Sequence, residues 1–122
     1  MTEKVAVKTG IDEIRFGYGG GITGKVITYV FSADGNLSDQ GKGIGLPKKV
    51  DYETTLAIFL HAREISTISF SEPDNVYSFV EIKMQKSSNR IVWSFGSTKV
   101  SEDVLQLYKK LISLTKETPS HE

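Results

Sequence analysis

Apolar and polar residues alternate along the first quarter of the chain. In residues 14–21 one row of alternate positions holds Ile14, Phe16 and Tyr18, and the opposite row holds Arg15 and three glycines. Because successive side chains of a strand point to opposite faces, this alternation predicts a strand with one apolar face and one nearly bare face. The run of Gly19, Gly20 and Gly21 predicts that the chain reverses within residues 19–23, since glycine adopts positive φ without steric cost.

Residues 25–33 are rich in β-branched and aromatic side chains, which favour a pleated and half-buried surface. Both of its alternating rows are largely apolar, so this segment is predicted to be a central strand. Asp34 and Gly35 follow it directly, and this dipeptide between two extended runs is a strong hairpin signal. A third, short strand is therefore expected to begin near Asn36.

The strand glycines allow two interpretations. The structural one is a tight turn, together with a place where a helix or an aromatic ring lies close on the sheet. The functional one is a glycine-lined surface that receives a ligand or a partner chain. On the functional interpretation, the candidate binding residues are the glycines of this hairpin and the aromatic residues expected around them: Gly17, Tyr18, Gly19, Gly20, Gly21, Tyr29 and Trp93.

The rest of the chain predicts two helices and two further strands. Asp51 caps a helix over residues 51–65, and Ser101 caps a second helix that ends near residue 115, each with apolar residues at spacings of three and four. Alternation predicts strands at 76–84 and 90–95, the second with its aromatic row, which includes Trp93 and Phe95, buried. Residues 4–8 are expected to form an edge strand or a loose arm, and residues 66–70 form at most a short strand.

This order, β-β-β-α-β-β-α, predicts an α+β fold. Strands joined by short turns are antiparallel, so we expect one antiparallel sheet of about five strands with two helices packed on one face. The other face of the sheet is expected to be partly exposed. Residues 1–116 are expected to form a single domain, followed by a flexible tail at 117–122.

Composition narrows the classes of function. The 122 residues include no cysteine, which excludes disulfides, thiolate metal sites and cysteine nucleophiles. Fifteen basic and fifteen acidic residues balance, whereas nucleic-acid binders usually carry a basic excess, so no nucleic-acid partner is expected. Nothing approaches the length of a membrane span or a signal peptide, so a cytoplasmic protein is expected.

Three short sequence patterns match parts of known functional motifs, but the rest of the chain does not support any of these functions. Residues 19–26 match the glycine-loop pattern of protein kinases, but the kinase catalytic motifs are missing and the chain is too short for two lobes. Residues 15–19 contain the arginine, aromatic and glycine residues of some RNA-binding segments, without the full recognition signature. The alternating glycines and lysines of residues 41–49 could bind an anion through backbone N–H groups, or could simply connect a strand to a helix.

Catalysis is not favoured. His61 and Glu64 are the only candidates for an acid–base pair, and one histidine beside one carboxylate on a helix is common by chance. With two histidines, no cysteine and scattered acids, neither a metal site nor a cofactor is expected.

The sequence thus favours a non-catalytic protein-interaction module, with self-association through the exposed face of the sheet as one form of it. The alternative is a small-molecule-binding domain with a pocket between the sheet and the helices, near Gly17 and Gly19.

Overall fold

The computed structural model describes residues 4–22, 24–39 and 48–115. Three helices and seven strands make up this part of the chain, and the fold is α+β. The helices are α1 (Val5–Thr9), α2 (Tyr52–Ile65) and α3 (Glu102–Thr115). The strands are β1 (Ile11–Gly20), β2 (Val26–Ser32), β3 (Asn36–Asp39), β4 (Lys48–Lys49), β5 (Ser71–Glu72), β6 (Val76–Met84) and β7 (Ser88–Ser94).

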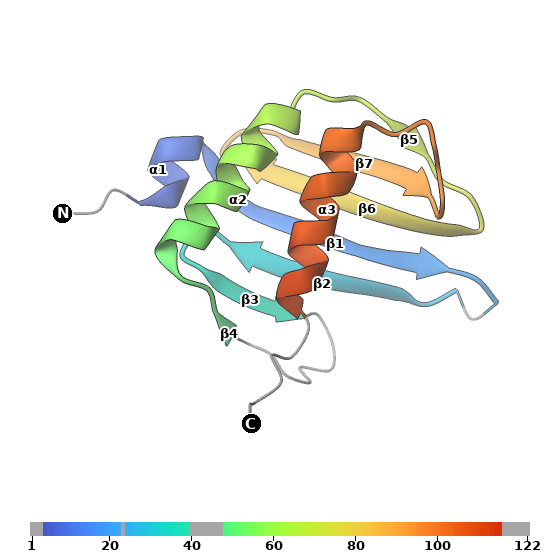
Figure 1. The fold of residues 1–122 in the computed structure, drawn as a ribbon, viewed down its shortest axis with the longest axis horizontal. Coiled ribbons are helices and arrows are strands. Elements are labelled where there is room, and N and C mark those ends of the chain that lie inside the picture. The colour runs from blue at the N-terminus through green and yellow to red at the C-terminus, as the bar shows by residue number, and fades with distance from the viewer. Residues whose placement is uncertain (1–3, 23, 40–47, 116–122) are drawn as a thin grey trace.

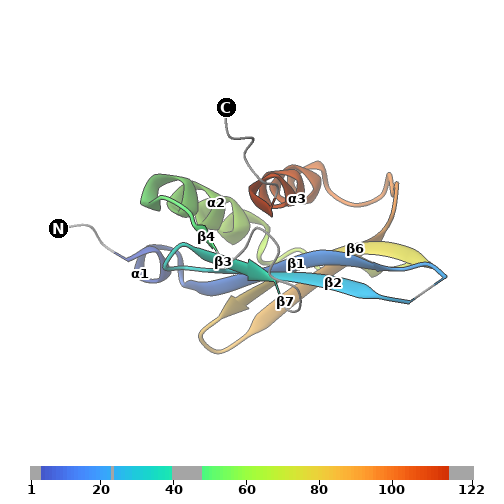
Figure 2. The same ribbon diagram turned by 90° about the horizontal axis from the view of Figure 1, so that it is seen from below.

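One sheet carries all of these strands, in the order β4-β3-β2-β1-β6-β7-β5. Figure 1 shows α2 and α3 lying side by side across the strands, and Figure 2 shows both on the same face of the sheet. This confirms the predicted α+β fold with two helices over one face. Strand β1 lies in the middle, paired antiparallel with β2 on one side and with β6 on the other.

The two predicted turns and the two helix caps are present. Gly35 has the left-handed backbone that the Asp34-Gly35 turn requires (φ 94°), and β2 and β3 pair on either side of it. The Asp51 carboxylate accepts a hydrogen bond from the backbone N–H of Thr54 at 3.0 Å, and the Ser101 hydroxyl accepts one from the N–H of Asp103 at 3.2 Å. Each cap satisfies a donor that the helix itself leaves without a partner.

The number of elements differs from the prediction of about five antiparallel strands and two helices. The sheet has two additional strands of two residues each, β4 and β5, and β5 runs parallel to β7, so the sheet is mixed. Strand β5 begins at Ser71, directly after residues 66–70, which were expected to form at most a short strand. Two-residue strands leave no alternation in a sequence, which is why they escaped the prediction.

The N-terminal segment is a helix, where an edge strand or a loose arm was expected. Val5 and Thr9, one helical turn apart, are its buried residues, and the Thr9 hydroxyl donates to the carbonyl of Val5 at 2.8 Å. Gly10 ends the helix in the left-handed conformation (φ 75°). The alternation of Val5 with Val7 was therefore misleading, because Val7 lies on the solvent side of the helix.

The core lies between the sheet and α2 and α3. Phe16 and Phe31 project into it from the sheet, and Phe59 and Leu107 from the helices. Ile91 and Trp93 are buried as predicted, but Phe95, in the same aromatic row, is 79 % exposed. Phe95 follows the end of β7, at a part of the sheet over which neither helix lies (Figure 1).

Gly17 is one of two tight points along β1; the other is Gly20, where a Cβ atom would lie 1.8 Å from the backbone oxygen of Asn75. A Cβ atom at Gly17 would lie 1.8 Å from the backbone oxygen of Ile27 in β2 and 3.3 Å from the ring of Phe79 in β6. At Gly19 the nearest atoms are 2.9 Å away or more, and the closest belongs to the end of the Tyr77 side chain. Of these two glycines on the bare face of β1, only Gly17 would place a side chain into the backbone of the neighbouring strand.

We predict that Gly17→Ala lowers the free energy of unfolding by about 3 kcal/mol, because backbone rather than a flexible side chain must move. Gly19→Ala is the matched control, two residues along the same face of the same strand, and should cost about 1 kcal/mol or less. Urea denaturation of the two variants measures the difference. Equal losses would show that the close approach of β2 to β1 does not constrain the sheet.

Candidate functional site

The predicted binding residues do not form one pocket. Gly17 and Gly19 lie opposite Phe79 and Tyr77 of β6, on the face of the sheet that carries no helix. Tyr18, Tyr29 and Trp93 lie on the opposite, helix-covered face, because they occupy the alternate positions of their strands. Gly20 and Gly21 lie at the end of β1, both with positive φ.

Aromatic side chains fill the bare side of β1. The Phe79 ring lies against Gly17 and is 1 % exposed, although it faces away from the helices. The guanidinium carbon of Arg90 lies 4.2 Å from the centre of this ring and covers it from the solvent side. A cation–π contact and aromatic packing against glycine therefore account for the glycine face, as the structural interpretation expects.

The remainder of this face, which we call the open face, is largely polar. Glu13 and Arg15 form an ion pair at 2.6 Å on β1, and Glu81 and Arg90 form a longer one at 3.9 Å between β6 and β7. Its large exposed apolar side chain is Val26, at the end near the β1–β2 turn.

The other face carries a row of exposed apolar side chains near the same turn. Ile27 and Tyr18 lie directly opposite each other on β2 and β1, and the backbone N–H of Phe95 donates to the carbonyl of Val76 at 2.9 Å. Tyr18 also pairs with Ser78, two residues after Val76, so all four side chains share one face. Their exposed fractions are 36 % for Ile27, 43 % for Tyr18, 44 % for Val76 and 79 % for Phe95. We call these four residues the strand-end strip.

Helix α3 forms a wall beside the strand-end strip. A cavity of about 350 Å³ lies between them, lined by Tyr18, Val76, Tyr77, Ser78, Phe95, Tyr108 and Ile112. The Tyr108 hydroxyl donates to the backbone oxygen of Gly17 at 3.0 Å, and its ring meets Trp93 edge to face at 5.1 Å. Tyr108 thus fixes α3 to β1 at Gly17, and the apolar strip begins immediately beyond that point.

The sequence contained a signal for part of this strip. Tyr18 belongs to the predicted apolar row of residues 14–18, and Ile27 to one of the two apolar rows of residues 25–33. Val76 begins the strand predicted at 76–84, and Phe95 was assigned to a buried aromatic row. Their exposure depends on which part of the sheet α3 covers, and no local sequence pattern indicates this.

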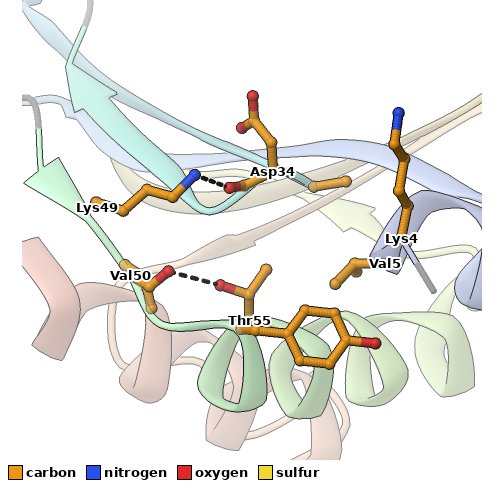
Figure 3. Close-up of a pocket in the computed structure, with 8 residues that line it drawn as sticks. Lys4, Val5, Asp34, Lys49, Val50 and Thr55 are labelled. Carbon is orange, nitrogen blue, oxygen red and sulfur yellow. Dashed lines mark hydrogen bonds between the residues drawn. The ribbon is translucent and has the colours of Figure 1, made fainter. Parts of the chain in front are cut away.

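A second cavity, of about 300 Å³, lies between α1, the β2–β3 turn and the start of α2. Figure 3 shows Lys49 directed to the backbone oxygen of Asp34, to which it donates a hydrogen bond, and Thr55 directed to that of Val50 at 3.4 Å. The Asp34 carboxylate accepts a hydrogen bond from Ser32, which holds the pKa of Asp34 below its usual value. These polar groups already bind one another and hold the turn to α2, so this cavity has a structural explanation.

The weak catalytic candidates gain no support from their surroundings. His61 contacts Lys110 rather than Glu64: the Lys110 ammonium lies 3.4 Å from the Nδ1 atom of His61. Among residues 4–22, 24–39 and 48–115 no group of three or more histidine, aspartate and glutamate side chains lies close enough to hold a metal ion. The candidate anion loop at residues 41–45 lies outside the described residues.

No described helix is both long enough and apolar enough to cross a bilayer. Neither the models of known protein families nor the curated proteins give a match to this chain. The function must therefore be argued from the geometry of the chain itself.

Burial raises the pKa of Tyr108 in α3 and of Tyr29 on the helix-covered face of the sheet. A phenol with a raised pKa in the folded state keeps its proton there after the unfolded chain has lost it. The unfolded state then binds fewer protons, so the free energy of unfolding falls as pH rises above about 10.

We predict that this alkaline fall is smaller in the double variant Tyr29→Phe/Tyr108→Phe than in the unchanged chain. Urea denaturation at a series of pH values between 8 and about 11 makes the comparison. An unchanged slope in the double variant would contradict the burial of these two hydroxyls.

Proposed function

We propose that this chain is a non-catalytic interaction module that binds a protein partner through the strand-end strip. The observation that carries the proposal is the continuous row of Ile27, Tyr18, Val76 and Phe95, all at least 36 % exposed, on one face of the sheet. Scattered single apolar residues are normal on a protein surface, but a contiguous apolar patch usually marks an association surface.

The open face offers less for association than the sequence suggested. Of its aromatic residues, Phe79 is already covered by Arg90 and Tyr77 is partly buried beside Gly19. Two ion pairs occupy the end away from the β1–β2 turn. Burying such pairs in an interface removes the charges from water, and this cost can exceed what the pairing returns. Self-association through the open face stays a prediction, and the proposal places the interface on the opposite side.

A small-molecule site is the second candidate, and one observation favours it. The cavity of about 350 Å³ beside Tyr108 falls within the size range of ligand pockets and has almost wholly apolar walls. A small apolar ligand that fills it would raise the melting temperature by mass action. Such a rise, across a panel of aromatic and aliphatic compounds, would favour this candidate over a protein partner.

Two adjacent residues of β2 provide the test. Ile27 belongs to the strand-end strip, and Val26, 49 % exposed, points to the open face. We expect Ile27→Glu to weaken capture of the partner from an extract of the source cells by roughly tenfold or more, because a charge replaces a buried apolar contact. Phe95→Glu should do the same, and Val26→Glu should leave capture unchanged.

Light scattering on the purified variants shows whether the partner is a second copy of the chain, and thermal melts verify that each variant is folded. Capture lost in Val26→Glu and kept in Ile27→Glu would move the interface to the open face. Capture unaffected by all three variants would overturn the proposal.

A further inference from the structure

We infer that the partner inserts one tryptophan side chain into the cavity between the strand-end strip and α3, with the indole N–H donating to the Ser78 hydroxyl. The inference rests on the proposed function, since three residues of the strip, Tyr18, Val76 and Phe95, also line this cavity. It adds to that function the chemical group by which the partner is held.

The cavity has room for a large side chain. An apolar cavity of about 150 Å³ is enough to hold benzene, and this one has a volume of about 350 Å³, so a side chain of two fused rings fits. Residues 95–101 connect β7 to α3 on the side of α3 away from α2, and Phe95 closes the cavity there (Figure 1). Because this connection occupies the space where a further helix would lie, the room that remains suits a single side chain.

The walls of the cavity favour an aromatic ring. Tyr18 contributes a ring from β1, Phe95 one from the connection after β7, and Tyr108 one from α3. Aromatic rings attract one another in edge-to-face and offset arrangements, and Tyr108 already makes an edge-to-face contact with Trp93. A ring inserted between Tyr108 and the strip extends this arrangement.

Ser78 brings a buried polar group to the cavity. Ser78 is 7 % exposed, and its hydroxyl interacts with the Tyr108 hydroxyl. Tyr108 donates its one hydroxyl proton to the backbone oxygen of Gly17, so it accepts from Ser78. The Ser78 proton is then in use, and the Ser78 oxygen is left as an acceptor. An occupant that displaces water from this oxygen must supply a donor, because an unpaired buried acceptor costs free energy.

Charge around the cavity favours a neutral occupant. None of the described residues that line the cavity is charged. On the adjacent edge of α3, Glu102 and Lys109 lie seven residues apart, or about two helical turns, and carry opposite charges that balance. An ammonium or carboxylate group would therefore lose its water without gaining a charged partner.

Tryptophan meets these conditions better than the other aromatic side chains. Its indole is neutral and has one N–H donor and no acceptor. Phenylalanine fits the walls but supplies no donor to Ser78. Tyrosine supplies a donor, but it has one ring instead of two and adds an acceptor of its own.

A second copy of this chain cannot supply the tryptophan. The sequence contains one tryptophan, Trp93, and this residue is 3 % exposed in the core. Its ring packs against Tyr108 and would have to leave the core to reach another molecule. The partner is therefore a different protein.

Indole and benzofuran, added separately to the purified chain, test the inference. The two molecules share the same fused rings, but benzofuran has an oxygen in place of the N–H group. We expect indole to shift the methyl resonances of Val76 and Ile112, which line the cavity, and to leave that of Val26 unchanged. Indole should bind roughly tenfold more tightly than benzofuran, because only indole donates to Ser78.

Ser78→Ala should abolish this preference, so that the two probes bind about equally. Ser94→Ala is the matched control, because Ser94 pairs with Tyr77 and lies on the open face, and it should keep the preference. Thermal melts verify that both variants are folded. Equal affinity for the two probes in the unchanged chain would overturn the inference, as would a preference that survives in Ser78→Ala. Tighter binding of p-cresol, which carries the ring of tyrosine, than of indole would also overturn it.

Competition separates a side chain of the partner from a free small molecule. Indole should displace the captured partner. Indole that binds in the cavity but leaves capture unchanged would assign the cavity to a free ligand and overturn the inference, as would light scattering that identifies the partner as a second copy. In each of these cases, capture that is lost in Ile27→Glu and Phe95→Glu leaves the proposed function standing. Capture insensitive to both variants would overturn the proposed function and the inference together.

Discussion

Gly17 is the position on which the arrangement of this fold depends. The backbone oxygen of Ile27 lies where a Cβ atom of residue 17 would be, the Phe79 ring closes over the same position, and the Tyr108 hydroxyl binds the Gly17 carbonyl. Strands β2 and β6 and helix α3 therefore all meet β1 at one residue. The absence of a side chain lets the two strands approach, and the hydrogen bond fixes where the helix crosses them. At Gly17 the approach of β2 and of the Phe79 ring leaves no room for a side chain, which is the packing role that the structural interpretation gives to a strand glycine.

This fixed crossing point also determines what the helices leave uncovered. Beyond Gly17 the strands continue toward the β1–β2 turn, and neither helix lies over them (Figure 1). The side chains on that end still follow the apolar pattern of the covered part, which produces an exposed row of Ile27, Tyr18, Val76 and Phe95. The opposite face is different in kind, because Arg90 covers the Phe79 ring and two ion pairs lie at the end away from the β1–β2 turn. We therefore place the proposed association surface on the face that also carries the helices.

Local patterns predicted the elements well where a pattern was long enough to read. The nine-residue alternation of β6, the caps Asp51 and Ser101, and the Asp34-Gly35 turn were all recognisable, because each depends on residues close in sequence. The five-residue helix α1 and the two-residue strands β4 and β5 were missed, since such short elements show no period. The candidate site could not be predicted, because the exposure of Phe95 depends on the position of α3 over a distant strand. The sequence showed the apolar row, but it did not show that this end of the row lies outside the cover of α3.

The exposure of individual methyl groups to a soluble nitroxide, measured by nuclear magnetic resonance with and without the bound partner, tests the central claim most directly. In the isolated chain the nitroxide should broaden the methyl signals of Ile27 and Val76 on the strip and of Val26 on the open face, since all three are exposed. With the partner bound, the signals of Ile27 and Val76 should become protected while that of Val26 stays broadened. Protection of Val26 with Ile27 and Val76 unchanged would contradict the account, as would protection of Ile27 and Val76 already in the isolated monomer.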